Sequence, residues 1–429
     1  MAKHPTKGSR CEVLRPAVPS ESGVYVDLRD ILVSSRGCLL NLSVRTGLKV
    51  LGAMLEEDRV RLCGPKGYPD PNRTATRYGA DDGQVVLGGR RVAIRKPRVR
   101  SVAGKELRLP TYQRFSQEDP LEARAWEQMV LGVSTRNYPR SLESVEEVVP
   151  VTATGKSAVS RRFIARTQKQ LEVFLSRSLE DEDFPILLLD GTGFGEHTLV
   201  VAMGIDTTGK KHVLGVVEGS TENEAVCRRL LSNLVDRGLP VERARLVVID
   251  GGKGLRKAVR NVFGNWALVQ RCQFHKIQNV IEHLPQGKRA WAKAAMRKAY
   301  DNEAAQAKRR LLELARNLEG HDGAAASLRE GLEETLTLLS LGITGALART
   351  LSTTNPIENL QGTLKRVSRN VTRWRSGGMA LRWAVTGLLE AQKSFRRLKG
   401  YRELPALLRA LEARIGSQEN HRTVVEDVA

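Results

Sequence analysis

Between residues 185 and 271, short apolar runs alternate with longer amphipathic stretches. Five short apolar runs are predicted strands: 186–190, 198–205, 212–217, 245–250 and 266–271. Two amphipathic stretches are predicted helices: 222–237, which ends at Gly238, and a helix that starts at Gly251-Gly252 and runs to 262. The order of three strands, helix, strand, helix and strand predicts a mixed α/β sheet.

The pattern on either side of this segment is mainly helical. Three predicted helices precede it, at 121–131, 141–148 and 156–176. The third follows a Thr154-Gly155 turn and carries Ser157, Arg161 and Arg162 near its start. Short helices joined by tight turns fit a helix-turn-helix DNA-binding region, although a generic helical bundle has the same pattern.

Residues 273–350 show no strand signal and are predicted to be helical, for example over 288–318. Pro356 suits the first turn of a further helix. Near the N-terminus, residues 84–87 and 91–94 predict a hairpin around Gly88-Gly89. This hairpin is rich in arginine, which fits either a solvated charged surface or contacts with a DNA backbone.

Charge narrows the range of functions. The 429 residues include 69 Lys or Arg and 48 Asp or Glu, a formal net charge of +21. A charge of this size favours a polyanionic partner, most commonly nucleic acid. No run of 18 apolar residues and no secretory signal are visible, so we expect no membrane span and a cytoplasmic protein. The five scattered cysteines, without a CxxC pair, indicate reduced thiols.

Common enzyme motifs are incomplete or missing. Gly155-Lys156-Ser157 ends like a P-loop, but Pro150 stands where the first glycine is needed. The glycines after Asp190 break the dinucleotide fingerprint, because Glu196 occupies its sixth position. GxSxG and HExxH do not occur. These observations argue against nucleotide hydrolysis, hydride transfer and serine hydrolysis.

Three carboxylates form the main candidate site. Asp190 and Asp250 each end an apolar strand and each precede a glycine. A single aspartate in this position is usually a turn former or a helix cap, but two of them in a strongly basic protein favour phosphodiester chemistry. Two Mg²⁺ ions can activate the attacking oxygen and stabilise the leaving one, and Mg²⁺ prefers carboxylate oxygens. Glu358, on a later helix, is the candidate for a third ligand.

Cys272 and His275 form a CxxH pair that allows three interpretations. They could be half of a zinc site, but only His283 lies near enough in the sequence to help complete four ligands. They could be a buried cysteine and a histidine that bonds to backbone. We favour His275 as a residue next to the active site that contacts a DNA phosphate or orients a carboxylate.

Four sequence blocks resemble the mutator-type bacterial insertion-sequence transposases. They are Leu-Leu-Leu-Asp190-Gly-Thr-Gly, Val-Val-Ile-Asp250-Gly-Gly-Lys-Gly, Gln-Arg-Cys272-Gln-Phe-His275 and Thr-Thr-Asn355-Pro-Ile-Glu358-Asn-Leu. The order and spacing of the blocks make this resemblance specific, and it extends from about residue 62 to 402. These transposases are DDE enzymes with a ribonuclease H-like core.

The resemblance implies both a site and partners. It implies that Asp190, Asp250 and Glu358 are the catalytic, metal-binding triad, and that the helices between Asp250 and Glu358 are an insertion in the core. It places Cys272 and His275 beside the active site. It also implies action on transposon terminal inverted repeats and target DNA, by a homodimer or larger assembly. Two Mg²⁺ or Mn²⁺ ions are expected, and no nucleotide, because one phosphodiester is exchanged for another.

A basic tract near the C-terminus is the second candidate DNA surface. Residues 361–402 hold eleven Lys or Arg and one acidic residue, Glu390. The candidate DNA-binding residues here are Lys365, Arg366, Arg369, Arg373, Trp374 and Arg375. Trp374 could stack on unpaired bases or belong to the core, and Trp383 fits the core better.

The sequence therefore predicts five regions. They are an N-terminal region with the Arg-rich hairpin (1–118), a helix-turn-helix-like region (119–180), the first part of a ribonuclease H-like core (181–272), a helical insertion (273–350), and the rest of the core with basic helices (351–429). The predicted function is metal-dependent DNA cleavage and strand transfer on the nucleoid. The alternatives are a catalytically silent DNA-binding regulator and a structure-specific nuclease.

Overall fold

The computed structural model describes residues 39–68, 71, 73–87, 90–117, 126–141, 151–152, 155–219, 221, 223–318 and 320–426. The chain folds into two compact units, residues 1–166 and 167–429. The division falls within one helix, α5 (Lys156–Ser176). In the part of the chain that the structure describes, no helix combines the length and the apolar character needed to cross a membrane.

The first unit is built around a long antiparallel hairpin. Its elements are α2 (Leu39–Cys63), β1 (Ala75–Leu87), β2 (Arg90–Ser101), β3 (Glu106–Leu107), α3 (Pro110–Gln117) and β4 (Val151–Thr152). The hairpin prediction is confirmed, and both strands are longer than expected: Ala75 and Val99, outside the predicted strands, are buried in a core with Leu55 of α2. The predicted turn, Gly88-Gly89, lies outside the described residues.

The helices predicted for residues 119–177 are described in part. Residues 126–130 are helical, whereas 121–125 and 142–148 lie outside the described residues. A 3₁₀ turn, η1 (Tyr138–Ser141), precedes that gap. The third helix is confirmed as α5, with the predicted bounds.

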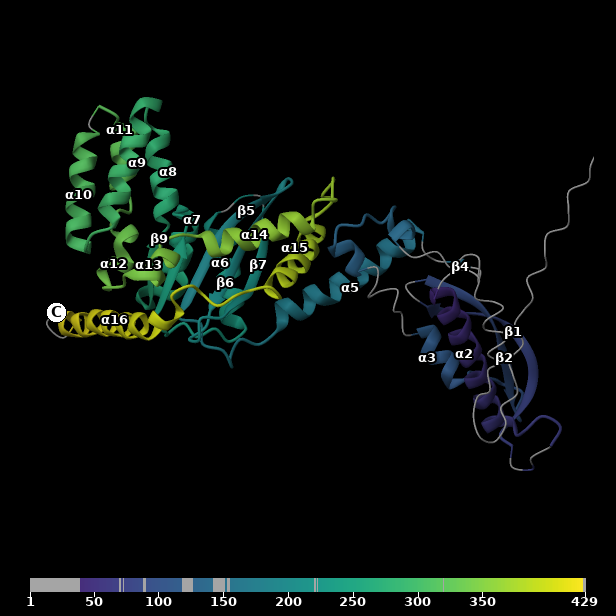
Figure 1. Ribbon diagram of the computed structural model, residues 1–429. Coiled ribbons are helices and arrows are strands. Elements are labelled where there is room, and N and C mark those ends of the chain that lie inside the picture. Colours follow the sequence, from purple (N-terminus) through teal and green to yellow (C-terminus); the bar gives the residue numbers. More distant parts are fainter. Residues whose placement is uncertain are drawn as a thin grey trace, which may run out of the picture. The chain divides into compact units, whose positions relative to one another are not determined.

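The second unit contains a five-stranded mixed sheet (Figure 1). Its strands are β5 (Ile186–Phe194), β6 (His197–Ile205), β7 (Lys211–Gly219), β8 (Arg245–Ile249) and β9 (Ala267–Arg271). They lie in the order β7-β6-β5-β8-β9, with the first three antiparallel and β8 and β9 added in parallel. The predicted α/β character and the predicted order of strands and helices are confirmed.

Helices lie on both faces of this sheet. Leu187 and Leu189 point into a core with α6 (Glu224–Asp236) and α7 (Lys253–Phe263). Side chains alternate along a strand, so Asp190 points to the opposite face. That face packs against α14 (Asn355–Val367) and α15 (Gly377–Gln392), and Pro356 occupies the first turn of α14 as predicted.

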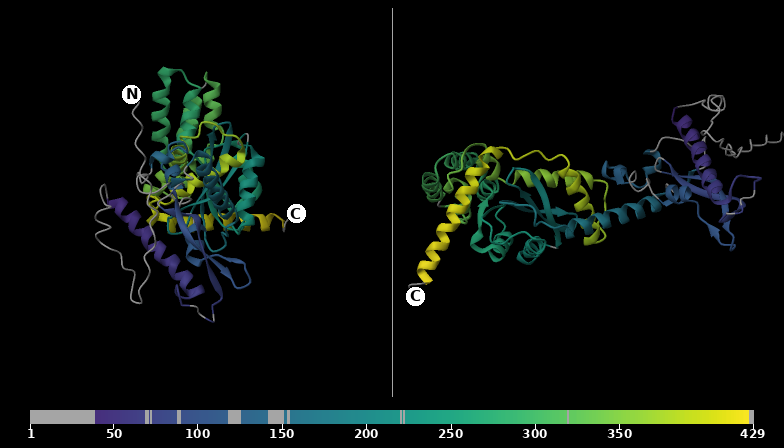
Figure 2. Two further views of the ribbon diagram at one scale, coloured as in Figure 1. Left: turned by 90° about the vertical axis from the view of Figure 1, so that its right-hand side faces the viewer. Right: turned by 90° about the horizontal axis from the view of Figure 1, so that it is seen from below.

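A helical insertion follows β9 and has its own core (Figure 2). Its elements are α8 (Gln273–Glu282), α9 (Gln286–Tyr300), α10 (Ala304–Asn317), α11 (Asp322–Arg329), η3 (Glu333–Leu336), α12 (Thr337–Ser340) and α13 (Gly345–Leu351). The stretch predicted to be helical over 288–318 forms two helices, which are separated where the chain turns at 301–303. The insertion returns to the sheet at β9, where Gln270 donates to the carbonyl of Thr335.

The chain ends in a helix that packs against the sheet unit. η4 (Tyr401–Glu403) leads into α16 (Leu404–Glu426). Arg243 joins this helix to the segment before β5 by ion pairs with Glu412 and Asp183.

Candidate active site

Asp190 and Asp250 come from neighbouring strands of the sheet. β5 and β8 are parallel and pair Leu189 with Ile249, so each aspartate follows a paired residue. Neighbouring strands are about 4.8 Å apart, and side chains alternate between faces. The two carboxylates therefore stand side by side on the face that α14 covers.

Asp190 is buried, with 5% of its surface exposed. Gln361 of α14 donates from Nε2 to Asp190 Oδ2 over 2.9 Å. Burial raises the pKa of Asp190 to about 7, and the negative charges of Asp250 and Glu358 add to this rise. The three carboxylates are thus close enough to interact through their charges.

Glu358 lies in the first turn of α14. The hydroxyl of Thr354, the residue before the helix, donates to Glu358 Oε1 over 2.5 Å. Glu358 and Gln361 are three residues apart and so share one face of the helix. The same face therefore holds a candidate ligand and the amide that binds Asp190.

Cys272 and His275 are joined by the start of α8. Cys272 is the N-cap residue, and its sulfur accepts from the backbone N–H of His275 at 3.5 Å. The spacing of three is that of a helix N-cap and the N3 residue whose N–H it binds. This local role explains the CxxH spacing without a metal.

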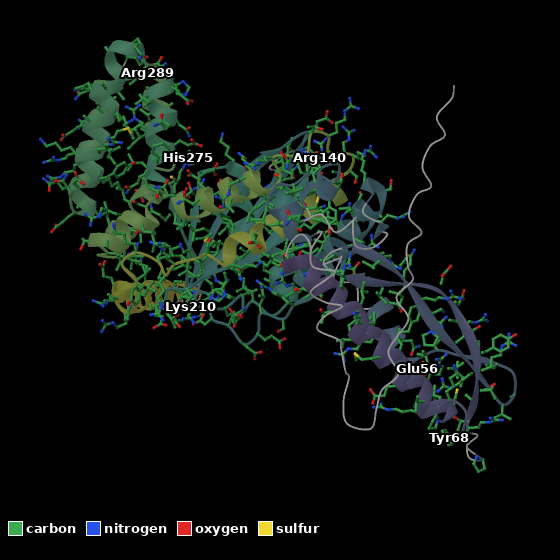
Figure 3. The ribbon with its side chains drawn as sticks, turned by 45° about the vertical axis from the view of Figure 1, so that its right-hand side comes forward. Glu56, Tyr68, Arg140, Lys210, His275 and Arg289 are labelled. Carbon is green, nitrogen blue, oxygen red and sulfur yellow. The ribbon has the colours of Figure 1, made fainter. Side chains whose placement is uncertain are left out.

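His275 lies in the first turn of α8, where the insertion leaves the sheet (Figure 3), and its ring is near Glu358. Its Nε2 is 4.0 Å from Glu358 Oε1, and its Nδ1 is 3.3 Å from the hydroxyl of Thr354. Contact with the Cys272 sulfur raises the pKa of His275 to about 9, and the charges of Glu358 and Asp250 contribute. These interactions favour the protonated form of the ring beside the carboxylates.

A buried arginine lies beside the turn that follows Asp250. Gly251 has a φ of +112°, and a Cβ added there would overlap the guanidinium of Arg271. Arg271 is 6% exposed and donates to the carbonyl of Glu330. Glycine is required at 251 both for this close approach and for the positive φ.

The oxygen donors of the site suit a hard divalent cation such as Mg²⁺. Among the described residues, no group of three or more His, Cys, Asp or Glu side chains is gathered closely enough to hold an ion as it stands. The donor set therefore fits such an ion in its chemistry.

The candidate DNA-binding residues fall into two groups. Ser157 and Arg161 are exposed on α5, and Arg162 is half-buried there. Five basic residues are exposed along the later part of α14 and the segment after it: Lys365, Arg366, Arg369, Arg373 and Arg375. Trp374 is half-buried against Phe194, and Trp383 is a core residue of α15 with 6% exposure.

Two residues of the site were not predicted from the sequence. Thr354 and Gln361 touch the carboxylates Glu358 and Asp190. The sequence did hold a signal for both, because helical spacing places residues four before and three after Glu358 on the same side of a helix. The pairing of Gln361 with Asp190 also needs the packing of α14 on β5, which periodicity alone does not supply.

Comparison with known proteins identifies relatives over most of the chain. The family model described as "Transposase, Mutator family" matches residues 32–397. The transposase for insertion sequence element IS256 in transposon Tn4001 of Staphylococcus aureus is 27% identical over 334 residues, which cover 74% of this chain and 81% of that protein. The transposase for element ISRM5 of Rhizobium meliloti is 30% identical over 267 residues, 60% of this chain and 63% of that protein.

Proposed function

The chain belongs to the Mutator family of transposases, and we propose that it is a DDE-type enzyme that cleaves DNA and joins element ends to a target. The observation that supports this proposal is that Asp190 and Asp250 stand on adjacent parallel strands, and that the helix carrying Glu358 is bonded to Asp190 through Gln361. Both other carboxylates raise the pKa of the buried Asp190. Perturbed carboxylates of this kind are typical of functional sites.

The three carboxylates would hold divalent metal ions, Mg²⁺ or Mn²⁺. Such ions would activate the attacking oxygen and stabilise the leaving oxygen of the phosphodiester. No nucleotide is needed, because one phosphodiester replaces another.

The neighbouring side chains orient these ligands. Thr354 fixes one oxygen of Glu358, and Gln361 fixes one oxygen of Asp190. The protonated form of His275, near Glu358, attracts a DNA phosphate or holds that carboxylate in place. The buried guanidinium of Arg271 adds positive charge beside Asp250.

We assign the sheet of the second unit to the ribonuclease H-like class. Support comes from three consecutive antiparallel strands followed by two parallel strands, with helices between the later strands. The two aspartates belong to adjacent central strands, and the insertion separates β9 from the helix that carries Glu358.

DNA binding is proposed to divide between the two units. α5 would read the element ends through Ser157, Arg161 and Arg162, as the recognition helix of a helix-turn-helix does. The basic residues after Glu358 would bind the backbone, and two element ends would be joined by a dimer or larger assembly.

A strand-transfer assay with one end-labelled substrate tests this function. The purified chain, with Mg²⁺ and DNA carrying the element's ends, should yield both cleaved ends and products joined to target DNA. Chelation of the metal should remove both products.

The two alternative functions give different results in the same assay. Cleavage without joined products would identify a nuclease, and binding without either product would identify a regulator. Either result would contradict the proposal.

A further inference from the structure

Trp374 connects a basic segment to the strand that carries Asp190. The segment, residues 368–376, joins α14 to α15 and is called the arginine segment here. The ring centroids of Trp374 and Phe194 are 4.1 Å apart, with their planes inclined by 43°. Phe194 is the last residue of β5 and is buried. The indole thus fastens the segment to the end of the catalytic strand.

Gly195 creates the space in which the indole lies. Its φ is +66°, and a Cβ added there would overlap the Trp374 ring. Gly193, two residues earlier, has nothing within 4 Å of an added Cβ. Glycine is therefore required at 195 both for the close approach of Trp374 and for the positive φ, whereas neither applies at 193.

A second contact lies next to the first, where the arginine segment joins α15. The carboxylate of Glu218, at the end of β7, lies against Gly377 at the start of α15. His197 Nδ1 is 2.6 Å from Glu218 Oε1, and Ser376 caps α15 by accepting from the N–H of Met379. Negative charge at a helix N-terminus is stabilising. The C-terminal end of the segment is thus held at the end of the sheet where β5 turns into β6.

The segment presents positive charge from this fixed position. Arg369, Arg373 and Arg375 are exposed, while Trp374 between the last two is half-buried. Arg373 and Arg375, on either side of the anchored indole, therefore stay at the surface. Because the segment continues from α14, it is tied to the elements of both Glu358 and Asp190.

We propose that Trp374 is a positioning residue that holds the arginine segment on the catalytic strand, so that its guanidinium groups bind phosphates of duplex DNA beside the reacting phosphodiester. This inference rests on the proposed function, because it assumes that DNA is the substrate. Trp374 acts through the arginines and does not itself stack on a base.

A coupling experiment tests the role of Trp374. Affinity of the full-length chain for a labelled blunt duplex of arbitrary sequence is measured in EDTA at several salt concentrations. Each phosphate contact adds about 0.9 to the slope of log K against log salt. The Arg373→Gln/Arg375→Gln pair should lower this slope by about two in the wild-type background.

The same pair of arginine substitutions should lower the salt slope much less in variants that have already lost the Trp374 contact. In Trp374→Ala, and independently in Gly195→Ala, the slope should fall by less than about one on removing the two arginines. Gly193→Ala is the matched control, and in this background removal of the two arginines should lower the slope as much as in the wild type. Trp374→Phe should keep most of this effect, and thermal unfolding checks that each variant is folded.

Two results would overturn the proposal. One is an equal loss of slope from the arginine pair in every background, which would make Trp374 independent of the arginines. The other is a loss of affinity in Trp374→Ala that is confined to a single-stranded probe, which would indicate base stacking. Because no metal and no catalysis are involved, failure here leaves the transposase assay unaffected, and failure of that assay leaves this coupling measurable.

Discussion

Asp190 shows how position in the sheet controls the chemistry of a single side chain. It lies within β5, where it is buried, and it interacts with the charges of Asp250 and Glu358. Burial and the two neighbouring negative charges each disfavour the charged carboxylate, and together they raise the pKa of Asp190 to about 7. A side chain that is costly to ionise in the protein alone is stabilised by a bound cation.

The Asp190→Asn variant should be more stable than the wild type at high pH. The folded pKa of Asp190 is about 7, above its value of about 3.9 in unfolded chains. The wild type therefore loses stability as pH rises from about 4 to about 7, and the variant does not. Thermal unfolding in EDTA should show a gain of up to a few kcal/mol at about pH 8 and a much smaller gain at about pH 5.

Two observations would count against this account of Asp190. A gain in stability that is the same at both pH values would show that its ionisation is not suppressed. Stabilisation of the variant by Mg²⁺ as large as that of the wild type would show that Asp190 does not bind the ion.

At the scale of elements, the sequence predicted the sheet better than the contacts between its layers. Strands β5 to β9 and helices α6 and α7 follow directly from apolar runs and amphipathic periodicity. Chain order and spacing also pointed to Asp190, Asp250 and Glu358. The pairing of Gln361 with Asp190, and of Trp374 with Gly195, depends on how α14 and its following segment pack on β5. Such long-range packing has no periodic signal in the sequence.

Helix α5 is proposed to recognise the terminal sequences of the transposable element. Arg161 is exposed near its start, and arginine can bind guanine by a bidentate contact worth roughly 1–3 kcal/mol. The Arg161→Ala/Arg162→Ala variant should therefore lose its preference for terminal over random DNA. Nonspecific binding should persist, because the basic residues after Glu358 are unchanged.

Binding isotherms for terminal and random DNA at two salt concentrations measure this preference. Lys169→Ala, an exposed basic residue two turns further along α5, is the matched control and should keep the preference. If the double variant keeps its full preference, sequence reading lies elsewhere, for example in the Arg-rich hairpin of β1 and β2.

At the scale of the whole molecule, most basic residues lie outside the elements that carry the three proposed catalytic carboxylates, although the arginine segment adjoins them. The carboxylates lie on one face of the five-stranded sheet, whereas the net charge of +21 comes from basic residues throughout the sequence. DNA affinity should therefore survive the loss of a carboxylate. This separation allows chemistry to be tested without loss of substrate binding.

The most direct test of the central claim is strand transfer by variants of the three carboxylates. Asp190→Asn, Asp250→Asn and Glu358→Gln should each bind the labelled DNA as the wild type does and form no joined product in Mg²⁺ or Mn²⁺. Glu390→Gln, an isosteric change on α15, should retain wild-type strand transfer. Near wild-type strand transfer by Glu358→Gln, or by either aspartate variant, would contradict the assignment of this site.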